Sequence, residues 1–241
     1  MGAMFRGAAA FNQPLHFATP GVTDMSGMFR DALVFNSPLI FEVANVATAR
    51  RALLSAVRSP RELSEGTSVV NNMADMFNGA AAFNQVLHID TSNVNDTSGM
   101  FRGAAVFNSP LDFDTANVNN MADMFNGATA FHKPLRFVTS NVNDMSGMFR
   151  GAIAFNQPLY FDTSSVSDMA DMFNGASTFK QLLSFDTSNV TNMSVYVHEQ
   201  PPSLPPPSHP PPCSPPPVPP PPSPSPSPSP PPPGPLSPPP T

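Results

Sequence analysis

Large apolar side chains in this chain fall at fixed positions that repeat every 24 residues. The dipeptide Met-Phe occurs seven times, and the gap between successive copies is always 24 residues or, once, 48. All 20 phenylalanines fall in three columns of that period, which begin at Phe5, Phe11 and Phe17. A residue type that is confined to fixed columns serves the repeat rather than a single site, so the pattern predicts one structural unit copied in tandem.

The first half of each unit has the spacing of a short helix. In the unit at 141–166, apolar residues stand at i, i+3, i+4 and i+7: Met145, Met148, Phe149 and Ala152. This spacing places them on one helical face. Glycines at 147 and 151 weaken a helix, so we expect no more than one or two turns.

The second half of each unit has the spacing of a strand. Leu159, Phe161 and Thr163 stand two residues apart, after a proline that suits the start of a strand. One coil of strand, turn, short helix and turn cannot bury its apolar face alone, whereas stacked coils bury it jointly. The expected fold is therefore an α/β repeat solenoid built from 24-residue coils, each with a short strand and a short helix.

The repeat region is expected to span residues 1–197, as about eight coils. Residues 47–66 lack the Met and Phe columns but keep the 24-residue length. We interpret them as a degenerate coil. An inserted helix and a pair of compensating frameshifts are the alternatives.

Composition separates a second region from the repeats. The chain has 33 prolines, and 26 of them follow Gln200. Residues 198–241 are therefore predicted to be a Pro/Ser-rich, disordered tail of polyproline II character.

The net charge of −6 argues against nucleic acid as a partner. No apolar stretch is long enough to span a membrane.

Catalytic and metal-binding patterns are absent from the sequence. There is no Ser-His-Asp arrangement, no cysteine nucleophile and no glycine-rich phosphate loop, so we expect a non-enzymatic protein without cofactor or metal. The Met columns repeat in every coil, which indicates a core rather than a copper site. Stacked aspartates such as Asp162 and Asp186 suit either turn capping or calcium, and we favour capping.

A candidate recognition face follows from the predicted strands. In each strand one residue lies between two buried positions and must point outward. This position varies from coil to coil while its neighbours stay fixed, and it holds His16, Ile40, His88, Asp112, Arg136, Tyr160 and Ser184. Candidate N-glycosylation sequons occur at Asn95, Asn189 and Asn192.

The repeat signature, NVxxMxxMFxxAxxFNxPLxFDTS, resembles the BspA-like leucine-rich-repeat surface proteins, in their Met/Phe/Asn-rich tandem repeat branch. The resemblance covers residues 1 to about 197. It implies leucine-rich-repeat-like coils, an extracellular or cell-surface location, and a role in adhesion or in binding a protein or polysaccharide ligand. It implies no catalytic residue.

The tail resembles the Ser-Pro rods of hydroxyproline-rich cell-wall glycoproteins. This resemblance implies a glycosylated stalk that attaches the repeats to wall or matrix. The alternative is an intracellular scaffold whose proline-rich tail recruits SH3, WW or profilin-type partners. The chain has no signal peptide and begins in mid-coil, so we expect a fragment or a misplaced start.

Overall fold

The computed structural model describes residues 1–19, 21–42 and 69–194. The chain divides into two units, Met1–Leu204 and Pro205–Thr241, and all described residues belong to the first. The predicted boundary at 197–198 and the predicted degenerate coil at 47–66 both lie outside the described residues.

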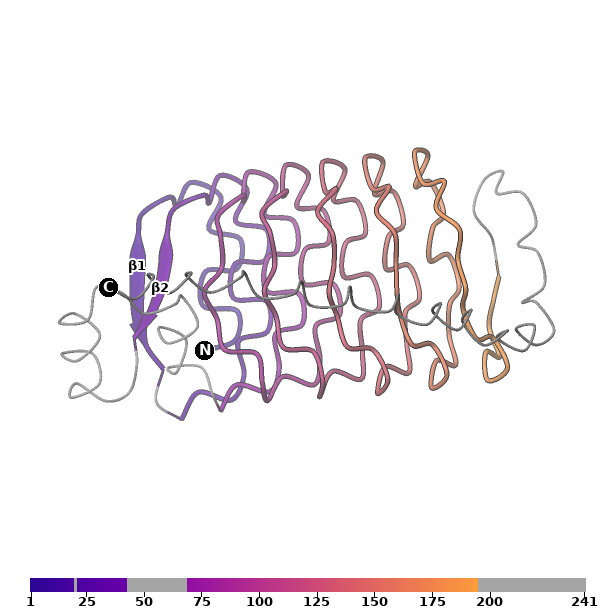
Figure 1. The fold of residues 1–241 in the computed structure, drawn as a ribbon. Helices are drawn as coiled ribbons and strands as arrows, with labels where there is room; N and C mark the ends of the chain where they lie inside the picture. Colours follow the sequence, from indigo (N-terminus) through magenta and orange to yellow (C-terminus); the bar gives the residue numbers. More distant parts are fainter. Residues whose placement is uncertain (20, 43–68, 195–241) are drawn as a thin grey trace, which may run out of the picture. The chain divides into compact units, whose positions relative to one another are not determined.

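Within the first unit the described chain winds through successive turns of similar shape (Figure 1). Strands β1 (Leu15–Ala18) and β2 (Leu39–Glu42) pair in parallel, with Leu15 opposite Leu39 and His16 opposite Ile40. Further parallel bridges join residues 24 apart in sequence, such as Asn120 to Asp144. Each coil therefore lies in register on the next.

The predicted short helix is wrong, because the described residues contain no helix. Residues 146–151 form a run of turns instead. Gly147 and Gly151 adopt left-handed φ values of 61° and 65°, which no α-helix contains. The N–H groups of Met145, Gly147 and Phe149 donate to carbonyls of the next coil, at 2.7–2.9 Å. Backbone donors that a helix would use internally thus join neighbouring coils.

The predicted strand is present in only two of the described coils, as β1 and β2. In later coils the equivalent residues still alternate, with Leu159 and Phe161 buried on either side of exposed Tyr160. In those coils a threonine hydroxyl makes hydrogen bonds to the backbone of the next coil, in place of part of the strand pairing. The Thr115 hydroxyl donates to the Val138 carbonyl at 2.9 Å and accepts from the Val138 N–H at 2.8 Å.

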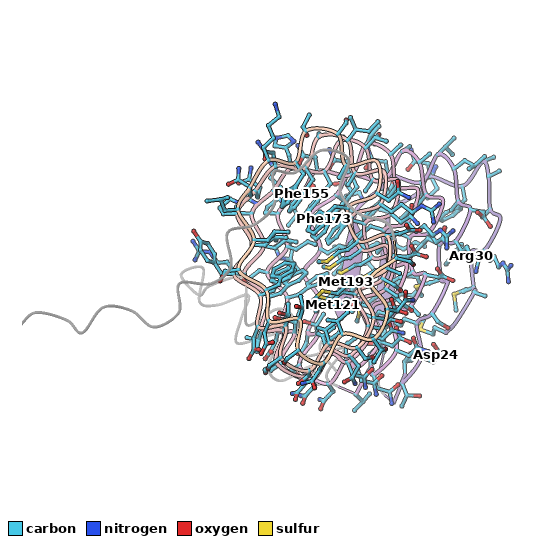
Figure 2. The ribbon with its side chains drawn as sticks, turned by 90° about the vertical axis from the view of Figure 1, so that its right-hand side faces the viewer. Asp24, Arg30, Met121, Phe155, Phe173 and Met193 are labelled. Atoms are coloured by element: carbon cyan, nitrogen blue, oxygen red, sulfur yellow. The ribbon has the colours of Figure 1, made fainter. Side chains whose placement is uncertain are left out.

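Phenylalanine and methionine columns form the core, as the sequence predicted. In the interior coils the rings of the first two Phe columns are fully buried, and each stacks on its equivalent in the next coil. The ring centroids of Phe101 and Phe125 lie 5.7 Å apart. Figure 2 shows Phe155, Phe173 and Met121 pointing inward, while Asp24 and Arg30 lie on the outside.

The coils on either side of residues 43–68 contact each other directly. Asp24 bridges Asn72, and the Met25 N–H donates to the Asn72 carbonyl at 2.9 Å. The rings of Phe29 and Phe77 stack with centroids 5.6 Å apart, the same spacing as between other neighbouring coils. No coil separates these two, although 48 residues separate them in sequence.

Deleting residues 43–66 is therefore expected to leave the repeat region folded. The deletion joins Glu42 to Thr67 and restores the order Phe-acid-Thr-Ser, which also occurs at Phe161–Ser164 and Phe185–Ser188. We expect the midpoint of thermal unfolding, measured by circular dichroism, to stay within a few degrees of the parent chain.

The control for this deletion removes the same number of residues elsewhere. Deleting 91–114 would place Asp75 beside Asp123 and discard buried side chains. We expect that variant to unfold at a clearly lower temperature. If the 43–66 deletion were equally damaging, the direct stacking of the two flanking coils would be wrong.

Candidate functional site: the outward strand face

The residues predicted to form a recognition face all lie exposed on one side of the coils. We call them the variable column: His16, Ile40, His88, Asp112, Arg136, Tyr160 and Ser184. Their in-chain neighbours point inward, as at Leu135 and Phe137, which are 5% and 7% exposed. Tyr160 is 86% exposed, so its ring projects almost entirely into solvent.

Two further exposed columns flank the variable column, two residues before and two residues after it. The preceding one, the apolar column, consists of Pro14, Pro38, Val86, Pro110, Pro134, Pro158 and Leu182. In the following column Asp114, Asp162 and Asp186 are exposed and acidic, while Val138 is apolar. Together the three columns form what we call the strand face.

Direct stacking across residues 43–68 sets the order of residues along this face. The backbone N–H of Asn84 donates to the Asn36 side chain at 2.9 Å, so the coil with Ile40 adjoins the coil with His88. Asp112 and Arg136 occupy neighbouring coils. They form no ion pair with each other within the described ranges, so both charges remain available to a partner.

The stacked aspartates cap turns, as favoured from the sequence. The Asp162 carboxylate accepts the Ser164 hydroxyl at 2.7 Å and its N–H at 3.1 Å, and Asp186 accepts the Ser188 N–H at 2.9 Å. The hydroxyl of Ser164, with its N–H, holds the pKa of Asp162 below its ordinary value, and the Ser188 N–H does the same for Asp186. Both carboxylates therefore stay charged under mildly acidic conditions.

The geometry offers little to a metal ion. Within the part of the chain that the structure describes, no three His, Cys, Asp or Glu side chains converge on a common point. His16 and His88 share a column, but Ile40 lies between them.

An asparagine ladder holds the turn next to the strand face. The side-chain amide of Asn117 donates to the Ser92 carbonyl of the preceding coil at 2.7 Å, and Asn141 donates to Ala116 in the same way. Asn189 repeats the contact with Ser164. Asn117, Asn141 and Asn189 therefore form a turn ladder in which each side chain bonds to the backbone of the preceding coil.

Replacing Asn141 by alanine is expected to lower the free energy of unfolding by about 1 kcal/mol, because the Ala116 carbonyl loses its donor. Asn143→Ala is the matched control. Asn143 is also exposed, and its side chain makes no hydrogen bond to the described residues. Chemical denaturation compares the two variants, and equal effects would argue against the ladder.

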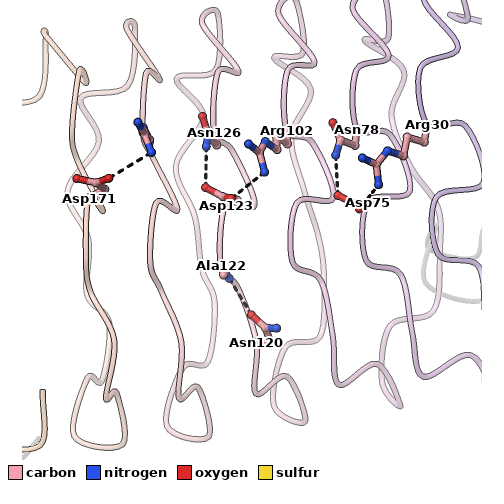
Figure 3. A network of polar contacts seen from close by, with 10 residues as sticks. Arg30, Asp75, Asn78, Arg102, Asn120, Ala122, Asp123, Asn126 and Asp171 are labelled. Atoms are coloured by element: carbon pink, nitrogen blue, oxygen red, sulfur yellow. Dashed lines mark hydrogen bonds and ion pairs between the residues drawn. The ribbon is translucent and has the colours of Figure 1, made fainter. Parts of the chain in front are cut away.

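An arginine–aspartate ladder on another side of the coils was missed by sequence reasoning (Figure 3). Arg30 pairs with Asp75 of the next coil at 2.8 Å, and Arg102 pairs with Asp123 at 3.0 Å. The second oxygen of Asp123 accepts from Asn126 of its own coil at 2.6 Å. A coil with SGMFR thus pairs with a following coil with MADMFN.

This ladder explains why the two coil types alternate. The residue directly before the Met-Phe pair adopts a left-handed φ in seven described coils, for example 55° at Asp123 and 61° at Gly147. A Cβ at Gly147 would overlap with the Asp123 carboxylate of the preceding coil. Asp75 and Asp123 are therefore each followed by a glycine in the next coil, and each pairs with an arginine of the previous coil. The alternation in the sequence was the available signal.

The three sequons differ in what their side chains do. Asn189 donates to Ser164, and the Asn192 amide donates to Asp168 at 3.0 Å. Asn95 is exposed, and its side chain makes no hydrogen bond to the described residues. A glycan at Asn95 would cost the fold no side-chain contact.

Comparison with known protein families gives three overlapping matches to one family, over residues 1–85, 64–159 and 135–200. The successive matches show that the chain is a tandem repeat. No curated protein and no solved structure matches significantly. Among the described residues no helix is long and apolar enough to cross a membrane. Because the matches span residues 1–200, the chain belongs to the family described as "Mycoplasma protein of unknown function, DUF285".

Proposed function

We propose that the protein is a non-enzymatic repeat protein that recognises a protein or polysaccharide ligand through its strand face, at a cell surface or in an extracellular matrix. The observation that carries the proposal is the variable column. Its residues differ from coil to coil, all of them are exposed, and the residues on either side hold them in register. Repeat proteins commonly bind through surfaces of this kind.

We also propose that the coils belong to a leucine-rich-repeat-like solenoid of the BspA-like kind. Support comes from the 24-residue register of the bridges and hydrogen bonds between coils, and from a core shared by all described coils. The absence of the predicted helix means that the turn side differs from a helical repeat, while the stacking principle is the same.

The test compares binding of labelled full-length protein to wall polysaccharide fractions and to intact cells. Arg136→Ala combined with Tyr160→Ala removes the column's cation and its aromatic ring, and we expect binding to fall at least tenfold. Arg6→Ala combined with Val106→Ala is the matched control, since it removes one exposed arginine and one exposed apolar residue outside the strand face. Unchanged binding in the first variant, with loss in the second, would place recognition on another face.

An intracellular scaffold is the second candidate function, because the tail contains 26 prolines. Mass spectrometry of the tail in the protein isolated from its source separates the two. Hydroxyproline bearing pentose or hexose supports the surface role. Unmodified proline in a cytosolic fraction supports the scaffold.

A further inference from the structure

The strand face has an order of residues that is complementary to itself. Read along the stack, the variable column runs His88, Asp112, Arg136, Tyr160 in four neighbouring coils. The midpoint of this run lies between an acidic and a basic residue. A second copy turned end for end therefore brings Arg136 opposite Asp112, and Asp112 opposite Arg136.

We propose that the partner of the strand face is the strand face of a second copy of this chain, in an antiparallel, two-fold symmetric dimer. This inference rests on the proposed recognition role of the face and names its ligand. In a two-fold interface every contact between residues i and j occurs twice. The axis lies parallel to the strands, between the coils of Asp112 and Arg136.

The apolar column fits the same arrangement. With the axis in this position, Pro110 faces Pro134 of the second copy and Val86 faces Pro158, so apolar surface covers apolar surface. His88 faces Tyr160 of the second copy, whose ring is 86% exposed in the single chain. An exposed tyrosine with a polar partner is a typical interface anchor.

The charges of the variable column are free to make these contacts. Asp112 and Arg136 are both exposed, and neither has an ion-pair partner among the described residues. The arginines of the other ladder, Arg30, Arg102 and Arg150, are in contrast already paired with aspartates. The strand face thus holds a complementary pair of charges that no described residue of its own chain pairs with.

Size and charge predict a weak dimer. The face is about 34 Å long and about 17 Å wide, so two copies bury about 1,200 Å², the low end for a specific interface. Asp162 would face Asp90 of the second copy, which opposes association. Two sheet faces pack about 10 Å apart, so carboxylates at the side of the face can keep part of their hydration.

A charge-swap cycle on the full chain tests the proposal by analytical ultracentrifugation, from about 1 to about 300 µM, with reductant present so that Cys213 forms no disulfide. We expect a reversible dimer. Asp112→Arg and Arg136→Asp should each weaken it at least tenfold, because each places like charges opposite one another twice. The double variant keeps the net charge and should restore dimerisation to within about threefold of the parent chain.

Tyr160→Ala provides an independent arm and is expected to weaken the dimer at least tenfold. Thermal unfolding of each variant checks that it is folded. A parent chain that stays monomeric, or a double variant that remains as weak as the single ones, overturns the inference. A dimer that none of the four variants changes also overturns it, because association then uses another face.

The outcomes separate this inference from the proposed function. If the chain is monomeric but its binding to cells or polysaccharide still depends on Arg136 and Tyr160, recognition by the strand face stands and self-recognition fails. If neither binding nor dimerisation depends on them, both fail.

Discussion

Replacing Phe149 by alanine is expected to lower the free energy of unfolding by about 3–5 kcal/mol, the usual cost of emptying a buried aromatic site. Phe149 is fully buried. Its ring lies 5.7 Å from Phe125 in the preceding coil, 5.5 Å from Phe173 in the next, and 4.2 Å from Phe155 in its own. Its loss therefore disrupts both columns at once. Chemical denaturation followed by circular dichroism measures the effect.

Tyr160→Ala is the control for that experiment. It removes an aromatic ring of similar size from the adjoining strand segment, but the ring is 86% exposed. We expect a change of less than about 0.5 kcal/mol, as for most surface positions. A Phe149 variant that is no less stable than the Tyr160 variant would contradict the buried column.

The periodicity of the sequence predicted the buried residues correctly but predicted the wrong conformation for half of them. Met145, Met148, Phe149 and Ala152 are all fully buried, as the helical spacing required. They lie on the same side of the chain, but the backbone that carries them is not helical. Left-handed residues at 147 and 151, four apart, turn the backbone back at each step. Spacing of i, i+4 indicates which side chains share a face. Both a helix and the observed run of turns place these side chains on one face.

Glycine was the available signal against the helix. Gly147 and Gly151 were interpreted as residues that shorten a helix, whereas their φ values permit a structure that replaces it. Asp123 occupies the equivalent position of Gly147 in the preceding coil and adopts the same backbone at 55°. An aspartate in three of the seven described coils with this position hid the left-handed requirement, because aspartate is one of the few residues that tolerates it.

The stacking of the coils at Asp24 and Asn72 could not be predicted from spacing. An insertion normally shifts the period of a repeat, and residues 43–66 number the same as one repeat. Only contacts between the flanking coils distinguish a degenerate coil from an inserted segment. Those contacts are the bridge from Asp24 to Asn72 and the stacking of Phe29 on Phe77. The exposure of the variable column, in contrast, was predicted residue by residue, because alternation along a strand decides which side chains point outward.

The alternation of the two coil types predicts a second large effect, at Gly147. Gly147→Ala is expected to lower the free energy of unfolding by about 2–3 kcal/mol. A left-handed φ costs a residue with a Cβ about 1–2 kcal/mol. The new methyl group must also displace the Asp123 carboxylate, which bonds to Arg102 at 3.0 Å and Asn126 at 2.6 Å. Losing those contacts adds about 1 kcal/mol.

A second substitution distinguishes overlap from backbone strain. Asp123→Gly removes the carboxylate that the new methyl group would strike, and the resulting glycine–alanine pair already occurs in the reverse order at Ala3 and Gly27, with φ values of 55° and 56°. The combined variant, Asp123→Gly with Gly147→Ala, should therefore be more stable than the sum of the two single effects predicts, by about 1 kcal/mol. Chemical denaturation of the parent chain, both single variants and the double variant gives this coupling directly. Strict additivity would mean that Gly147 is required for its φ alone, and that the aspartate–glycine contact does not enforce the order of the coils.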